Sequence, residues 1–194
     1  MRALFWLLAC TILPARAELG LRPVLPPPGV EVVLLDVRPL AVCQARSVAR
    51  ARCLPASDFL DVQGRLAPWR EVVWLMSTAG LTGAEAVIVL GDDGVDRRFV
   101  AGLLELAGQR RVWLVERPVP ALWKSGWPAG QGRPRDFARQ VAYTAPMREG
   151  DIVLPHEPRP AATVTAADVR SAVTRWVELR LAGKQWRILL GGQT

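Results

Sequence analysis

Two of the three cysteines in this 194-residue sequence, Cys43 and Cys53, lie ten positions apart. Two thiols at such positions can form a structural disulfide, or they can exchange disulfides or carry a persulfide. Reactive pairs usually have two intervening residues and a helix N-terminus that lowers the thiol pKa, and neither feature is evident here. The pattern therefore favours a structural disulfide or two buried thiols over a redox site.

A second candidate site follows the apolar run Ala86–Leu90, which is typical of a buried strand. Three carboxylates follow this run, those of Asp92, Asp93 and Asp96. They supply the oxygen ligands that a hard cation prefers, but their spacing does not match a calcium loop of the helix–loop–helix type. We therefore expect no metal here. We predict instead a ligand-binding loop made of Gly91, Asp92, Asp93, Gly94, Val95, Asp96 and Arg97.

The only histidine, His156, lies in a short segment bounded by Pro155 and Pro158. A lone histidine with no cysteine nearby cannot build the usual zinc site, and a serine–histidine–aspartate arrangement would require it to reach back to the sheet. We expect a solvated loop at this position and no cofactor in the protein.

The elements that must position these residues alternate between strands and helices. Apolar, β-branched runs predict strands, and apolar residues at helical spacing between them predict helices. This alternation indicates an α/β fold with a small parallel sheet and helices on both faces. Ligands of such sheets bind at the carboxyl ends of the strands, which favours the loop after Leu90. The expected strands are 32–37, 52–54, 86–90 and 112–115, and the expected helices are 40–49, 68–79 and 99–107.

The first 17 residues have the pattern of a secretory signal peptide. Arg2 precedes an apolar run from Ala3 to Leu13, and small residues stand at Ala15 and Ala17, where a signal peptidase would act. The run is shorter than the ~20 residues that span a membrane. An uncleaved anchor and a lipoprotein at Cys10 are the alternatives. We expect cleavage near Ala17 and a periplasmic or secreted protein.

Composition indicates a folded protein, because 51% of the residues are hydrophobic. Loss of the signal peptide lowers the basic count from 25 to 23 against 18 acidic residues, for a net charge of +5. A charge of this size, dominated by arginine, is typical of a solvated surface, so we expect no nucleic-acid binding. The apolar runs after the signal peptide are too short for a transmembrane segment.

The chain divides into five segments. After the signal peptide (1–17) comes a proline-rich, extended lead-in (18–30), and then the α/β domain (31–130). Residues 131–162 are rich in proline, arginine and glycine and predict a linker along the surface. The remainder (163–194) predicts a C-terminal helix and strand extension. Its helix should span 166–181 and its strand 186–190, and we expect both to dock on the domain rather than to bind a partner.

The order and spacing of several segments resemble the rhodanese-like (sulfurtransferase) superfamily. Residues 34–38 read LLDVR, as in the opening strand of that family, and residues 43–55 occupy the place of its "YxxGHIPGAxxxP" segment. Residues 54–66 are similar to its "LP…DLLD…GrL" connection. Residues 87–91 resemble "VVVYC", and 123–128 resemble the closing "W…GxP". The resemblance covers about 31–130 and implies a single rhodanese-like domain.

The departures from the family pattern concern its active site. Gly91 stands where a sulfurtransferase carries its nucleophilic cysteine. Ser47 replaces the family's histidine, Arg50 replaces a glycine, and residues 116–118 replace a common "DGG" turn. In the family, the loop after the cysteine binds a sulfur anion with its backbone N–H groups. Here it carries three carboxylates, which should repel thiosulfate.

We therefore expect an exported rhodanese-like protein without sulfurtransferase activity that acts as a binding or accessory module. The expected partner is another exported protein or a small anionic or sulfur compound, and the sequence does not identify it. The alternative is a periplasmic thiol–disulfide or persulfide-handling protein that uses Cys43 and Cys53.

Overall fold

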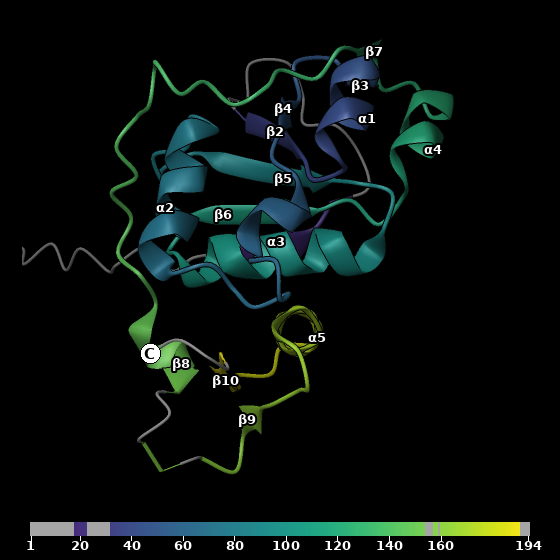
Figure 1. Cartoon of the computed structure of the whole chain (residues 1–194). Coiled ribbons are helices and arrows are strands. Elements are labelled where there is room, and N and C mark those ends of the chain that lie inside the picture. The colour runs from purple at the N-terminus through teal and green to yellow at the C-terminus, as the bar shows by residue number, and fades with distance from the viewer. Residues whose placement is uncertain (1–17, 23–31, 154–156, 159, 191–194) are drawn as a thin grey trace, which may run out of the picture.

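The computed structural model describes residues 18–22, 32–153, 157–158 and 160–190. Its centre is a five-stranded parallel sheet with helices around it, which confirms the predicted α/β fold (Figure 1). The predicted signal peptide, His156 and most of the proline-rich lead-in lie outside the described residues. The strand order is β1 (Glu18–Leu21), β6 (Arg111–Leu114), β5 (Ala86–Leu90), β2 (Val32–Asp36) and β4 (Arg52–Cys53).

Strand β5 occupies the middle of the sheet, and all five of its residues are buried. Its side chains alternate between the two faces, as strand geometry requires. Val87 and Val89 join the larger core, whereas Ile88 and Leu90 join a smaller core on the other face. The continuous apolar run that predicted a doubly covered strand is thereby explained.

Different helices cover the two faces. The larger core contains residues of α2 (Trp69–Thr78), α3 (Gly94–Leu106) and the 3-10 helix η1 (Ala56–Phe59). The smaller core contains residues of α4 (Val119–Lys124). Helix α2 begins after Pro68 and ends before Gly80, whose φ of 76° suits a helix stop, as its sequence predicted.

Helix α1 (Leu40–Ala45) is shorter than the predicted helix at 40–49. Its backbone becomes extended at Arg46, and residues Ser47–Val48 form β3, which pairs antiparallel with β7 (Ala129–Gly130). Because Ser47 and Val48 are both fully buried in this pairing, tertiary contacts override the local helical pattern.

Helix α3 begins five residues earlier than the prediction of 99–107. The carboxylate of Asp93 accepts a hydrogen bond of 2.7 Å from the Val95 N–H, so Asp93 caps a helix that starts at Gly94. The predicted ligand-binding loop is correspondingly shorter. Only Gly91, Asp92 and Asp93 lie between β5 and α3.

Residues Glu18–Leu21, predicted to lie in the extended lead-in, belong to the central sheet. They form β1 and pair in parallel with Arg111–Leu114 of β6. The Glu18 N–H donates to the Arg110 carbonyl at 3.0 Å. Beyond the strand, the guanidinium carbon of Arg22 lies 4.1 Å from the ring centroid of Trp113. The described part of the lead-in, residues 18–22, thus begins with a paired strand.

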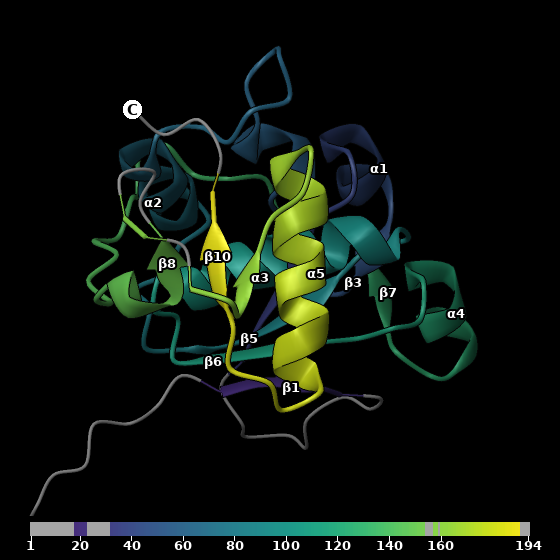
Figure 2. The ribbon, with the colours of Figure 1, turned by 90° about the horizontal axis from the view of Figure 1, so that it is seen from below.

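The C-terminal extension consists of α5 (Val169–Leu181) and a small parallel sheet. The sheet has the order β8 (Ile152–Val153), β10 (Arg187–Leu189) and β9 (Thr163–Val164). Helix α5 lies across α3, on the far side of α3 from β5 (Figures 1 and 2). The predicted docking of this helix on the domain is confirmed.

Two ion pairs and a close approach at a glycine are among the contacts that hold α5 on α3. Arg170 pairs with Asp96 at 3.0 Å, and Arg180 pairs with the fully buried Glu105 at 2.8 Å. Between these pairs, a Cβ atom on Gly102 would lie 2.4 Å from Cγ1 of Val173. The glycine therefore allows the two helices to approach closely.

The segment before the small sheet runs over the domain and is tied to it by backbone hydrogen bonds. The N–H groups of Gly132, Asp136, Thr144 and Arg148 donate to backbone carbonyls of the domain at 2.8–3.0 Å. The 3-10 helix η2 (Glu149–Asp151) then leads into β8. In the part of the chain that the structure describes, no helix has the length and apolar character needed to cross a membrane.

Replacing Gly102 with alanine should weaken the α3–α5 contact. At an open helical position this change would stabilise the helix by about 1 kcal/mol, but here the new methyl group collides with Val173 and Val177. We expect the free energy of unfolding to fall by about 1–3 kcal/mol in urea titrations. Gly150→Ala, at a position with open space, is the control and should change little. Equal stability of Gly102→Ala and the wild type would contradict this account.

Helix α5 starts at Val169 rather than at 166 because Asp168 caps it. The carboxylate accepts the Ser171 N–H at 2.8 Å, and this hydrogen bond lowers the pKa of Asp168. Asp168→Ala should lower the free energy of unfolding by about 1 kcal/mol at neutral pH. Because the folded pKa is the lower one, the charge-dependent part of this stabilisation is complete above the ordinary aspartate pKa, about 3.9. It is lost as the pH falls through the folded value.

The measurement is urea unfolding of both proteins at pH 7 and near pH 3. Asp168→Asn is the matched control, since asparagine keeps an oxygen that accepts the Ser171 hydrogen bond. A loss with asparagine as large as that with alanine would mean that charge, not the cap, stabilises the helix start.

Candidate functional site

The carboxyl end of β5 has no space for a side chain at residue 91. A Cβ atom built on Gly91 would lie 2.9 Å from Cγ2 of Val37 and 3.1 Å from Cγ of Arg97. The first distance is shorter than a normal carbon–carbon contact, so a cysteine here would displace Val37 or Arg97. The volume next to Gly91 is filled by the protein itself.

The side chain of Arg97 packs beside Gly91 in the candidate loop. It is 6% exposed, its Nη1 donates to the carbonyl of Gly91, and its Nη2 donates to the carbonyl of Glu116 at 2.7 Å. Burial lowers the pKa of Arg97, and the neighbouring Arg98 lowers it further. Among the described residues, no carboxylate forms an ion pair with this guanidinium. Its hydrogen-bond partners there are the two carbonyls. Three carboxylates act on its charge from a greater distance and oppose the fall in its pKa, those of Asp93, Asp92 and Glu116.

The three carboxylates of the candidate loop point to different partners. Asp92 accepts the Val119 N–H at 2.9 Å and lies 3.5 Å from Nη1 of Arg38, so it joins the start of α4 to the end of β2. Asp93 caps α3, and Asp96 pairs with Arg170 on α5. Burial raises the pKa of Asp96, and Arg170 opposes that shift.

This arrangement differs from the predicted ligand-binding loop, in which all three carboxylates would face the ligand together. Asp93 is the N-cap of α3 and its carboxylate binds the helix backbone, whereas Asp96 lies in the first turn of α3 and its carboxylate faces α5. Within the predicted ligand-binding set, the structure brings together Gly91 and Arg97, while Asp96 belongs to the contact with α5.

A buried ionic network at the end of β2 supports the loop. The fully buried Asp36 accepts hydrogen bonds from Nη2 of Arg38 at 2.7 Å and from Oγ of Ser47 at 2.5 Å. Although burial opposes it, hydrogen bonding to Asp36 raises the pKa of Arg38. Arg38 also donates to the Arg46 carbonyl, so the network joins β2 to the end of α1. Ser47, which stands where the resembled family has a histidine, serves this network.

Arg50 has a φ of 68°, the left-handed region that favours glycine. It is the only residue other than glycine with positive φ in the described ranges. The backbone at this position therefore has the conformation for which the resembled family uses glycine.

Cys43 and Cys53 form a disulfide that joins α1 to β4, with their Cα atoms 5.9 Å apart. Both residues are fully buried. A Cβ atom on Gly132 would lie 2.3 Å from Sγ of Cys43 and 2.5 Å from Sγ of Cys53, so the Gly132 backbone lies directly against the sulfur atoms. Thiol–disulfide exchange requires access to a sulfur atom, which this packing blocks.

A further finding concerns residues that could bind a metal ion. In the described part of the chain, no group of three or more histidine, cysteine, aspartate or glutamate side chains could hold a metal ion.

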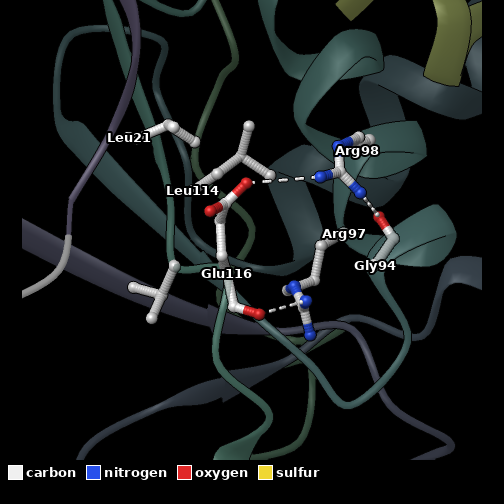
Figure 3. Close-up of a pocket in the computed structure, with 7 residues that line it drawn as sticks. Leu21, Gly94, Arg97, Arg98, Leu114 and Glu116 are labelled. Carbon is white, nitrogen blue, oxygen red and sulfur yellow. Dashed lines mark hydrogen bonds and ion pairs between the residues drawn. The ribbon is translucent and has the colours of Figure 1, made fainter. Parts of the chain in front are cut away.

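A hollow that sequence reasoning missed lies beside the loop, where β1 and β6 end (Figure 3). Residues 18–22 do not predict this hollow from their sequence, because Leu21 and Arg22 line it only when β1 is paired with β6.

The chain matches no protein-family model, and no curated protein matches it at a significant level. Solved structures do have a similar fold. YnjE aligns with a TM-score of 0.55 and 14% sequence identity, over 65% of this chain and 32% of YnjE.

Two structures from ergothioneine chemistry align at 12% identity and a TM-score of 0.53, each over 63% of this chain and 33% of its own. One is EanB with a persulfide in a tetrahedral intermediate state with ergothioneine. The other is the anaerobic ergothioneine biosynthesis enzyme from Chlorobium limicola, bound to its substrate trimethyl histidine. This chain spans about a third of the length of each of these proteins. At such identities the likeness establishes the fold.

Gly91→Ala should destabilise the protein although it adds only one methyl group. The new carbon would press on Val37 and Arg97, and we expect a loss of about 1–3 kcal/mol in the free energy of unfolding, measured in urea. In a double-mutant cycle with Val37→Ala, the combined loss should be smaller than the sum of the single losses, because the second change removes the colliding carbon. Additive losses would show that Val37 does not limit the space at residue 91.

Proposed function

We propose that this chain is a rhodanese-like module without sulfurtransferase activity, and that it acts as an exported binding or accessory protein. The proposal is supported by the order of the resembling segments between residues 31 and 130 and by the parallel α/β fold. The structural likeness to YnjE and EanB, at 14% and 12% identity, agrees with a fold used in sulfur chemistry.

The observation that carries the proposal is the filled space at Gly91. Sulfur transfer of this type needs a thiolate, whose sulfur attacks the sulfane sulfur of the donor, forms a persulfide and releases the remainder of the donor as an anion. Glycine supplies no nucleophile. Val37 and Arg97 occupy the position that the first carbon of a cysteine side chain would need, so the surrounding residues are packed for glycine.

The thiol–disulfide alternative has less support. Cys43 and Cys53 are bonded to each other, are fully buried and lie under Gly132. Catalytic disulfides are exposed to their substrates, and their thiols have lowered pKa values. A disulfide that closes a loop of this length stabilises a protein by roughly 2–3 kcal/mol, which agrees with a structural role in an oxidising compartment.

Export remains part of the proposal because of the signal-like pattern of residues 1–17. The pair of Cys43 and Cys53 supports it, since disulfides persist in secreted and periplasmic proteins. In that setting the partner would be another exported protein or a small anionic or sulfur compound.

The purified protein should not transfer sulfur from thiosulfate or mercaptopyruvate to cyanide. We expect a rate at least about 1,000-fold below that of a sulfurtransferase with a cysteine nucleophile, assayed in parallel, because loss of a nucleophile typically costs more than this. Turnover near that of the positive control would overturn the proposal.

A second arm separates the two candidate functions. Turnover that disappears in a Cys43→Ser/Cys53→Ser double variant would favour persulfide handling by these sulfurs. For the non-catalytic module we expect no turnover in either protein. Titration with a thiol reagent should detect no reaction at Cys43 or Cys53 in the native or the unfolded chain until a reductant has cleaved the disulfide.

A further inference from the structure

The hollow beside the candidate loop has two adjoining parts, which we call the edge pocket. The outer part has a volume of about 310 Å³ and is lined by Leu21, Arg22, Leu114, Val115, Glu116 and Arg117. The inner recess is lined by Gly94, Arg97 and Arg98 together with four of the same residues. The recess has about 10 Å³, enough for a group the size of one water molecule.

Positive charge dominates the lining. Arg22, Arg97, Arg98 and Arg117 come from three separate parts of the chain, and Glu116 is the only acidic lining residue. The buried guanidinium of Arg97 donates hydrogen bonds to two carbonyls. Among the described residues, no carboxylate forms an ion pair with it. Arg22 contributes a second signal, because its Nη1 is buried with no hydrogen-bond partner in the described structure. Guanidinium groups in such surroundings favour an anion.

The opposite wall is apolar. Leu21 at the end of β1 lines the pocket together with Leu114 and Val115, which are themselves only 2% and 1% exposed. Leu21 is 51% exposed, so part of its side chain is in contact with water. Covering this surface with an apolar group would be favourable. The volume of the outer part lies at the lower end of the range for small-molecule sites.

We propose that the edge pocket binds a small organic anion. One oxygen of its charged headgroup enters the inner recess beside Arg97 and Arg98, and its apolar body lies on the exposed side chain of Leu21. This inference rests on the proposed function only in treating the chain as a binding protein. The site lies between the ends of β1 and β6 and the start of α3, so binding there needs no group at residue 91 and no sulfur atom.

Glu116 acts as an internal competitor for the site. Its carboxylate lies 3.3 Å from Nη2 of Arg98, whose Nη1 donates to the Gly94 carbonyl (Figure 3). The Glu116 side chain is 59% exposed, so this ion pair is weak and an incoming anion can displace it. The headgroup would then take over the contact with Arg98 that the Glu116 carboxylate makes.

The test uses naphthalenesulfonate as the anionic probe and naphthalenesulfonamide as its neutral counterpart of nearly the same shape. Binding to the full chain is measured by calorimetry at low salt. We expect saturable one-site binding of the sulfonate, at least about tenfold tighter than that of the sulfonamide, because charge-assisted hydrogen bonds add to the apolar contact. Inorganic sulfate should bind more weakly than the sulfonate, since it lacks an apolar body.

Two substitutions in the pocket should act in opposite directions. Arg98→Gln should weaken binding of the sulfonate about fivefold or more, and Glu116→Gln should strengthen it about two- to fivefold. The matched controls are Arg175→Gln and Glu178→Gln, which break an exposed ion pair of the same residue types on α5. Both controls should bind as the wild type does.

Several outcomes would overturn the inference. Equal affinity for the sulfonate and the sulfonamide would mean a purely apolar site, and equal affinity for sulfate would mean a simple anion site. An equal loss in Arg98→Gln and Arg175→Gln would mean a nonspecific effect of charge. Absence of sulfonate binding would overturn the edge pocket and leave the proposed function in place, whereas sulfurtransferase turnover would overturn the proposed function alone.

Discussion

The buried guanidinium of Arg97 determines the architecture of the sheet's carboxyl edge. By donating to the carbonyls of Gly91 and Glu116, it joins the chain after β5 to the chain after β6. Its aliphatic part fills the space beside Gly91, and its charge has no carboxylate partner among the described residues. A single side chain therefore fills the space beside Gly91 and contributes one of the four guanidinium groups that line the edge pocket. A smaller residue here would remove the guanidinium hydrogen bonds of both carbonyls, the one to Gly91 in buried surroundings.

Sequence reasoning predicted most of the central fold because strong apolar runs such as Ala86–Leu90 have one physical solution, a strand covered on both faces. It missed β1, since Glu18–Leu21 is too short to show a period and forms a strand only through pairing with β6. It also assigned Asp96 and Arg97 to an open loop. The sequence contains the cap at Asp93, but charged residues are usually solvated, and nothing in their order indicates that Arg97 is buried.

The C-terminal extension completes the larger core rather than forming a separate unit. Helix α5 contributes Val173, Trp176 and Val177 to the same apolar cluster that contains β5 and α3. Because Gly102 removes the side chain at the crossing, van der Waals contact between the two helices extends to the backbone of α3. The amphipathic pattern of the helix predicted over residues 166–181 indicated this docking, but the glycine that permits it had no recognisable signal in the sequence.

The position of Gly132 against the disulfide connects two distant parts of the chain. The bond closes a short loop between Cys43 and Cys53, and the residue that shields it follows almost 80 positions later. A reductant reaches the sulfur atoms only when residues 130–133 lift away from Ala49 and Ala51, to which they are packed and hydrogen-bonded. The rate at which a reductant cleaves the disulfide of the native protein therefore measures how often residues 130–133 separate locally from Ala49 and Ala51.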